Sequence, residues 1–142
     1  MNDAQIILVK QSWAKVEPIA PTAATLFYDR LFTVSPGVRR LFRDDMAKQK
    51  QKLIEMLTTI VDGLHNLDAI VPDAQALARR HAAYGAKPEH YEVVGDCLLW
   101  TLGQGLGEDF TPDVKEAWTA AYAILATTMI DAQNEEPVRT AA

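Results

Sequence analysis

The residue with the clearest chemical potential in this chain is His81, which lies in a helical segment that stops at Gly85. Leu77 lies one helical turn before it, so the imidazole shares a partly apolar helix face. The neighbouring Arg79 and Arg80 disfavour a further positive charge and so favour the neutral ring. A neutral imidazole presents a lone pair to a metal. Taken alone, a single helical histidine is more often a packed or a surface residue, so the rest of the chain must decide.

The other candidate ligands do not form a protein-only metal site. His65 and His90 lie at a helix end and a helix start, where solvent contact or capping is their ordinary role. No two histidines are three or four residues apart, which excludes an HExxH zinc motif. The lone Cys97, in an apolar helical run, is expected to be a buried structural thiol and cannot build a thiolate cage. A single protein ligand suits haem iron, because the porphyrin supplies four nitrogens.

The elements that must position these residues are helices. Apolar residues recur at helical spacing, and no segment alternates long enough to predict a strand. We expect an all-α chain with helices over about 3–17, 21–33, 46–64, 72–85, 89–106 and 111–133. A short helix should follow Ser35 and Pro36, with the serine as its cap. The 142 residues predict one domain, 1–142, with a frayed tail over about 134–142.

Composition narrows the function classes. The chain is 49% hydrophobic and 23% charged, which is enough apolar material for a core. Its net charge of -5 argues against binding a nucleic-acid phosphate backbone, which needs a basic face. The start of the chain lacks the basic residues of a secretory signal, and its apolar runs are too short to cross a bilayer. We therefore expect a cytoplasmic protein with neither membrane nor nucleic acid as partner.

The whole pattern resembles the globin family, and within it the bacterial single-domain haemoglobins related to the haem domain of flavohaemoglobins. The resemblance covers almost the entire chain and depends on order and spacing, since each motif alone is weak. It implies a globin fold of about seven to eight helices packed around a haem pocket. The matching residues are Trp13, Leu26-Phe27-Tyr28, Pro36, Leu41-Phe42, Gln49 with Leu53, His81, Tyr84-Gly85, His90-Tyr91, Gly95-Asp96 and Ala117-Trp118 through Tyr122.

By this resemblance the cofactor is haem b, iron protoporphyrin IX, with His81 as the proximal iron ligand. Phe42 is similar to the aromatic residue that wedges against the haem ring, and Leu53 to the apolar residue that crowds the sixth coordination site. Tyr28 and Gln49 resemble the distal polar pair that donates hydrogen bonds to a bound gas. Without the resemblance, Tyr28 is more often a core residue with a satisfied hydroxyl, and Gln49 a solvated polar residue.

The proximal side departs from the family pattern at one position. Tyr91 resembles the tyrosine that supports the proximal histidine, which in the family is joined by a glutamate on the last helix. Counting from Trp118 places Gln133 at that position, so we expect the anionic member to be missing. Arg80 resembles a basic residue that reaches a haem propionate, although a plain surface role suits it equally well.

The resemblance implies a haem protein that binds O2, NO or CO reversibly, with high affinity, for oxygen transport or storage. The alternative is an enzyme, a nitric oxide dioxygenase or nitrite reductase, with an external reductase as partner. A third hypothesis is a regulatory globin fold without haem, and the combination of His81 with Phe42 argues against it.

Overall fold

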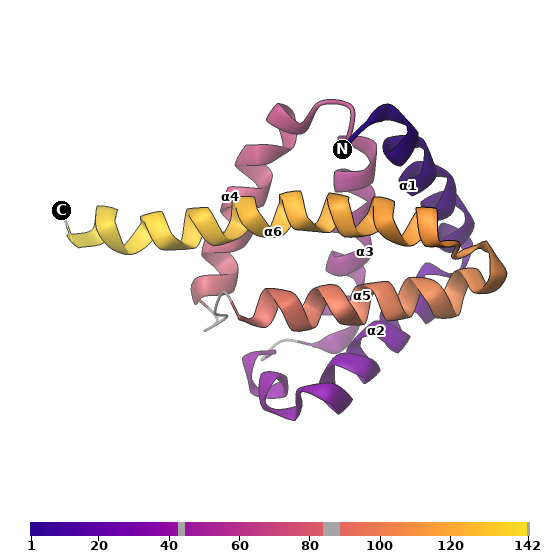
Figure 1. Ribbon diagram of the computed structural model, residues 1–142. Coiled ribbons are helices and arrows are strands. Elements are labelled where there is room, and N and C mark those ends of the chain that lie inside the picture. Colours follow the sequence, from indigo (N-terminus) through magenta and orange to yellow (C-terminus); the bar gives the residue numbers. More distant parts are fainter. Residues whose placement is uncertain (43–44, 84–88, 142) are drawn as a thin grey trace.

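Helices of two kinds make up the computed structural model, which describes residues 1–42, 45–83 and 89–141 but not the side chains of Leu67, of 80–83 and of 133–141. The described chain contains no strand, which confirms the all-α prediction. Six α-helices and three short 3-10 helices follow one another (Figure 1): α1 (Asp3–Val16), η1 (Glu17–Ile19), α2 (Ala20–Val34), η2 (Pro36–Leu41), α3 (Met46–Asp62), α4 (Leu67–Ala83), α5 (His90–Leu106), η3 (Gly107–Asp109) and α6 (Pro112–Ala141).

Side-chain caps fix several helix starts. Asn2 accepts from the Gln5 backbone amide at 2.8 Å while the Gln5 side chain accepts from the Asn2 amide at 3.1 Å, a capping box at α1. The Thr111 hydroxyl accepts from the Val114 amide at 3.3 Å at the start of α6, as its place before Pro112 predicts. Gly107 ends α5 and adopts a φ of 57°, a positive value that a residue without a Cβ tolerates best.

The start predicted for α4 was wrong. We expected this helix to open at Pro72 or Asp73, but it begins at Leu67 and carries Pro72 inside. The proline removes one backbone donor, and the apolar packing of the preceding turn offsets that loss. Ile70 and Val71 line a small cavity together with residues of α3 and α6. A Cβ on Gly63 would overlap the Ile70 side chain, so this glycine lets the two helices approach closely.

Two other local predictions also need correction. The Ser35 side chain makes no capping hydrogen bond; instead its carbonyl accepts from the Val38 amide at 3.1 Å, because the tighter 3-10 geometry of η2 uses i to i+3 bonds. The last helix was expected to end near Gln133, yet α6 continues to Ala141 and projects beyond the other helices (Figure 1). Met129 and Ala132 are buried near this end, so the helix is anchored when it leaves the core.

The helices pack as crossed layers around α5 and α6. These two run side by side in opposite directions (Figure 1). In this view α4 crosses behind α6, and α2 lies against α5. α1 packs on α6, and α3 packs on α2. Within the described residues α4 packs chiefly on α6, so the helix that carries His81 is held mainly from one side.

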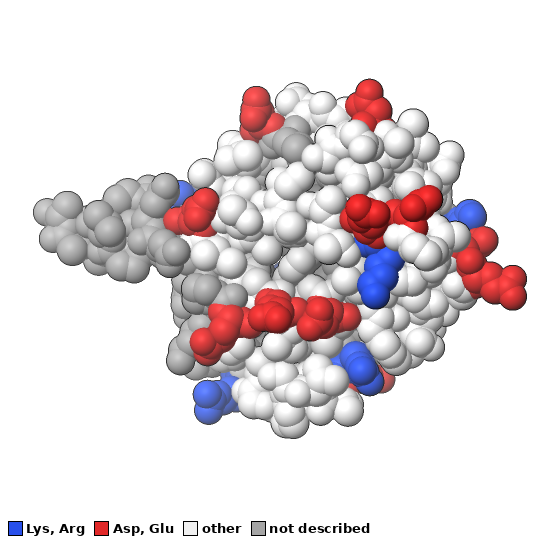
Figure 2. Space-filling view, viewed as in Figure 1, with Lys and Arg blue, Asp and Glu red and all other residues white. Residues whose placement is uncertain are grey.

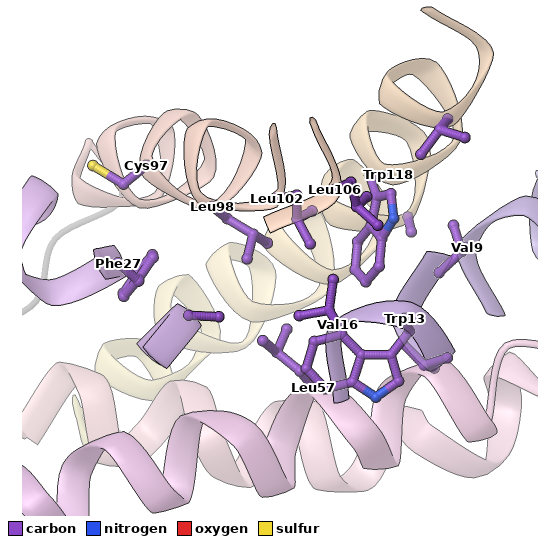
Figure 3. Close-up of a cluster of buried hydrophobic side chains, with 14 of the residues drawn as sticks. Val9, Trp13, Val16, Phe27, Leu57, Cys97, Leu98, Leu102, Leu106 and Trp118 are labelled. Carbon is purple, nitrogen blue, oxygen red and sulfur yellow. The ribbon is translucent and has the colours of Figure 1, made fainter. Parts of the chain in front are cut away.

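A large first core cluster joins α1, α2, α3, α5 and α6. At its centre Trp13 and Trp118 meet edge to face, with ring centroids 6.2 Å apart, and the Trp118 indole nitrogen donates to the Ser12 hydroxyl at 2.8 Å. Figure 3 shows the aliphatic side chains that close around this pair. Cys97 belongs to the cluster and is 2% exposed, as expected of a structural thiol. The labelled members in Figure 3 are Val9, Trp13, Val16, Phe27, Leu57, Cys97, Leu98, Leu102, Leu106 and Trp118.

A smaller second core cluster joins α4, α5 and α6. Three of its buried members are alanines, and a cavity of about 30 Å³ lies between it and the first cluster. The buried members of the second cluster are Ala74, Ala78, Tyr91, Leu125, Met129 and Ala132.

No helix in the described part of the chain is both long and apolar enough to cross a membrane.

Candidate functional site

Tyr28 and Gln49 form a polar pair inside an otherwise apolar wall. Tyr28 lies on α2 and is 3% exposed, while Gln49 lies half-buried in the first turn of α3. The Gln49 amide Nε2 donates to the Tyr28 hydroxyl oxygen at 3.3 Å. Among the described residues the hydroxyl proton has no acceptor, so Tyr28 retains one hydrogen bond to give.

The Tyr28 hydroxyl is a neutral donor over the physiological range. Burial raises its pKa to about 12, against a smaller lowering by the hydrogen bond from Gln49. A neutral phenol donates a hydrogen bond to an electron-rich ligand and carries no charge that would need a counter-ion. This pair can therefore stabilise a small ligand that accumulates negative charge.

Aromatic rings surround the pair. The Phe42 ring lies edge-on to Tyr28, with centroids 5.5 Å apart, and Phe32 lies 5.9 Å from Tyr28. Phe27, one residue before Tyr28, meets it edge to face at 5.0 Å. Edge-to-face contacts of this kind add specific attraction to apolar burial, so they restrict the tyrosine ring to one place. Phe42, a predicted site residue, is thus brought together with Tyr28.

Apolar side chains that are only half-buried line the same region. Leu53 lies one helical turn after Gln49 on α3, packs against the first core cluster and keeps part of its surface uncovered. Phe42 and Phe32 are half-buried as well. Half-covered apolar surface beside a buried polar pair is typical of a small-molecule pocket. The structure therefore places Tyr28, Phe42, Gln49 and Leu53 around one apolar region.

Whereas Tyr28 belongs to the first core cluster, Tyr91 lies at the start of α5 and belongs to the second. Its side chain is 7% exposed, and its hydroxyl has no hydrogen-bond partner among the described residues. Burial raises its pKa to about 12. Ala78 of the same cluster lies one helical turn before His81 on α4. A buried unsatisfied hydroxyl is costly, so this atom calls for a partner that the described chain does not supply.

Tyr122 fixes the backbone of Tyr91. Its hydroxyl donates to the Tyr91 carbonyl oxygen at 2.6 Å, and burial raises its pKa. A Cβ on Gly95 would lie 2.7 Å from the Tyr122 ring, so the glycine makes room for it. Sequence reasoning named Tyr122 only as the end of a segment that matches the globin pattern and gave it no role of its own. The bond spans 31 residues and has no local sequence signal.

The predicted iron ligand can be placed only by its backbone. His81 and Arg80 lie in the last turns of α4, and Gln133 lies on α6, but their side chains are outside the described residues. The predictions for these three side chains therefore stay predictions. Within the described residues, no three His, Cys, Asp or Glu side chains are grouped to hold a metal ion by themselves.

The surface is predominantly acidic where α5 faces solvent. Figure 2 shows acidic side chains in a row along this helix, where Glu89, Glu92 and Asp96 are exposed. The described residues of this face form no basic patch (Figure 2). A row of carboxylates repels a phosphate backbone, in keeping with the net charge of -5.

Comparison with known proteins identifies the class that this fold and site define. The globin family model matches residues 25–129, and the chain belongs to the globin family. A flavohemoprotein of Vibrio cholerae is 31% identical over 137 residues, covering 94% of this chain and 35% of that protein. A flavohemoprotein of Bacillus subtilis is 28% identical over 138 residues, covering 95% of this chain and 35% of that protein. The chain thus spans about a third of the length of these relatives.

Solved structures agree on the fold. A bacterial globin from Campylobacter jejuni superimposes with a TM-score of 0.83 at 25% identity, covering 94% of this chain and 97% of that one. An engineered carbene transferase from Rhodothermus marinus superimposes with a TM-score of 0.91 at 24% identity, covering 100% of this chain and 99% of that one. The predicted globin fold is confirmed.

Membership of the globin family implies a haem cofactor, and the described residues fit one. The half-buried rings of Phe32 and Phe42 and the side chain of Leu53 offer apolar surface for a porphyrin to cover. The Tyr91 hydroxyl, which has no partner among the described residues, lies in the second core cluster, to which the helix of His81 contributes. A histidine ligand needs a second group to orient its ring, and a tyrosine hydroxyl can serve that purpose.

Proposed function

We propose that this chain is a haem protein that binds O2 and NO reversibly, with haem b ligated by His81. The buried Tyr28–Gln49 pair carries the proposal, because a globin pocket needs no such pair for packing alone. When bound, the haem supplies an iron with one coordination position open to a diatomic gas. Leu53 and Phe42 keep that position apolar and exclude water.

The distal residues decide how long a gas stays. Tyr28 donates its hydroxyl hydrogen to the ligand while Gln49 donates to the Tyr28 oxygen, so the two bonds form a chain that orients the phenol. One such bond contributes about 0.5–1.5 kcal/mol, and more when the acceptor carries charge. We therefore infer a slow release of O2 and a high affinity.

On the proximal side, Tyr91 orients the His81 ring. Its hydroxyl is buried and lacks a partner among the described residues, which supports this role. Because Gln133 stands where the family has glutamate, the anionic member of the network is missing and less electron density is pushed toward the iron. This favours reversible binding over peroxidase-like chemistry.

Two measurements test the proposal. The purified protein should show a Soret band, and Tyr28→Phe should accelerate O2 dissociation about 10-fold, the loss of one hydrogen bond to a charged acceptor. Gln49→Leu should accelerate it about 2- to 5-fold by the same reasoning. Gln51→Leu is the matched control, since Gln51 is exposed two positions away and bonds Glu55. An O2 dissociation rate that is unchanged in Tyr28→Phe contradicts the distal role.

Nitric oxide dioxygenation is the second candidate, because the relatives are flavohemoproteins. In that reaction one NO and one O2 combine with one electron to give nitrate, and a separate reductase must supply the electron. Stopped-flow mixing of the oxygenated protein with NO, followed by turnover with a flavin reductase and nicotinamide, tests it. Sustained nitrate formation favours the enzyme, and a single stoichiometric burst favours the reversible binder.

A further inference from the structure

Arg39 is an exposed arginine in η2 whose position in the sequence suggests a solvated surface role. The structure gives it two contacts with Phe42. The Arg39 guanidinium donates to the Phe42 carbonyl at 2.9 Å, and the Phe42 amide donates to the Arg39 carbonyl at 3.1 Å. These two bonds close a ring over residues 39–42 and fix both backbone polar groups of Phe42.

The guanidinium also lies over an aromatic ring. Its central carbon is 5.3 Å from the centroid of Phe32, a cation–π distance. Phe32 in turn meets Phe42 edge to face at 5.5 Å, and both rings contact Tyr28. Arg39 therefore holds the Phe32 ring and the Phe42 backbone, and the rings of both residues border Tyr28.

The Phe42 carbonyl needs the hydrogen bond from Arg39 because of its place in the chain. It is the residue that ends η2, with a φ of -100° and a ψ of 92°, so its carbonyl has left the helical ladder. A carbonyl at a helix end requires a donor from elsewhere. Asp45, three residues on, caps α3 by accepting from the Ala47 amide at 3.0 Å. Phe42 thus joins two separately fixed elements, and the Arg39 bond sets its orientation.

We propose that Arg39 is a positioning residue for the gas-binding hydroxyl of Tyr28. It acts through Phe42 and Phe32, whose rings hold the phenol where Gln49 can donate to it. The inference rests on the proposed function, since the consequence of a loosened Tyr28 is faster loss of a bound gas.

The neighbouring arginine provides a matched comparison. Arg40 is exposed on the same short helix and makes no hydrogen bond, ion pair or ring contact with the described residues. Arg39→Ala and Arg40→Ala remove the same charge from adjacent positions. Arg39→Lys keeps the cation and a donor but not the planar fork.

The experiment measures O2 dissociation and the C–O stretch of the carbon monoxide complex in the haem-loaded variants. Arg39→Ala should accelerate O2 loss about 3- to 5-fold and broaden or split the C–O band, because a loosened phenol takes several positions. Arg40→Ala should match the wild type, and Arg39→Lys should restore part of the loss. In the Tyr28→Phe background, Arg39→Ala should have no further effect, since the group it positions is gone.

A readout on the haem-free protein keeps the test independent of gas binding. Ring flips of Phe42, followed by NMR, should be faster in Arg39→Ala than in Arg40→Ala. Equal O2 dissociation rates in the two alanine variants, or an additive effect in the Tyr28→Phe background, overturn the inference while the proposed function stands. A wild-type protein without a Soret band, or with an O2 rate insensitive to Tyr28→Phe, overturns the proposed function instead.

Discussion

The two core clusters differ in the size of the side chains that fill them. The first contains the Trp13–Trp118 pair and draws on five of the six α-helices. In the second, three of the six buried members are alanines on α4 and α6, and the cluster borders a cavity of about 30 Å³. Large interlocking side chains bury more apolar area than alanines do. The first cluster therefore stabilises the fold, and the second leaves α4 dependent on further contacts.

Each cluster leaves one buried polar atom without a partner among the described residues, Trp13 Nε1 in the first and the Tyr91 hydroxyl in the second. Only the second lies beside the helix that carries His81. We propose a division of labour in which both clusters border the cofactor, and the second, which holds the Tyr91 hydroxyl beside the helix of His81, depends on it more. The predictions below test that division.

Removal of the predicted iron ligand should have the largest effect. His81→Ala should lose nearly all bound haem, because it removes the proposed protein ligand of the iron. The ratio of Soret to protein absorbance measures the loss, and added imidazole should restore part of it. His65→Ala is the control, since His65 is exposed after α3. Full haem retention by His81→Ala would contradict the whole proximal assignment.

Truncation of one buried leucine to alanine in each cluster should lower the unfolding free energy by different amounts. Leu102→Ala, in the first cluster, should cost about 3–5 kcal/mol of unfolding free energy, since Leu102 is 2% exposed. Leu125→Ala should cost less, about 2–3 kcal/mol, because Leu125 lines the cavity and already lacks neighbours on one side. Urea unfolding of the haem-loaded proteins measures both.

The rate at which haem transfers to a scavenging apoprotein should rank the two leucine variants in the opposite order. Leu125→Ala should release haem faster than Leu102→Ala, although its fold is the more stable of the two. Equal transfer rates at unequal stabilities would argue that the second cluster has no special link to the cofactor.

The sequence predicted the globin fold, for reasons visible in single residues. Val9, Trp13 and Val16 recur at helical spacing on α1, and such periodicity directly encodes which face is buried. The distal pair followed from a family resemblance, and the structure then brought Tyr28 and Gln49 to 3.3 Å. Their separation of 21 residues carries no local signal for that contact.

Where prediction failed, tertiary contacts had overridden a local rule. Pro72 looked like a helix start, but packing of Ile70 and Val71 carries α4 through it. The Arg39 contacts were missed because an exposed arginine next to another arginine gives no pattern of its own. The bond from Tyr122 to the Tyr91 carbonyl depends on how α5 meets α6, which no local sequence window describes.

Tyr91→Phe should have opposite effects on the haem-free and the haem-loaded protein. Without haem the variant should be more stable by about 1 kcal/mol, because it removes a buried hydroxyl that lacks a partner among the described residues. With haem it should release the cofactor faster, because the His81 ring loses its support. Chemical unfolding of both forms measures this. Tyr122→Phe is the contrast, since it breaks a 2.6 Å bond to the Tyr91 carbonyl and should destabilise both forms. A destabilised haem-free Tyr91→Phe protein would mean that its hydroxyl is already paired.

The smallest effect concerns alkaline pH. Burial raises the pKa of Tyr28 from 10.0 to about 12, so the unfolded chain releases this proton before the folded one does. The stability that Tyr28 contributes is therefore complete below pH 10 and is lost as the pH rises to about 12. Tyr28→Phe should flatten this decline in urea midpoints.

The O2 dissociation rate should stay constant from neutral pH to pH 10, because the hydroxyl remains protonated throughout that range. A rate that rises well below pH 10 would mean that Tyr28 ionises early, which requires a solvent-accessible phenol. The first cluster, which contains Tyr28, would then depend on the cofactor to cover it as much as the second cluster does. The two clusters would differ only in the size of their side chains.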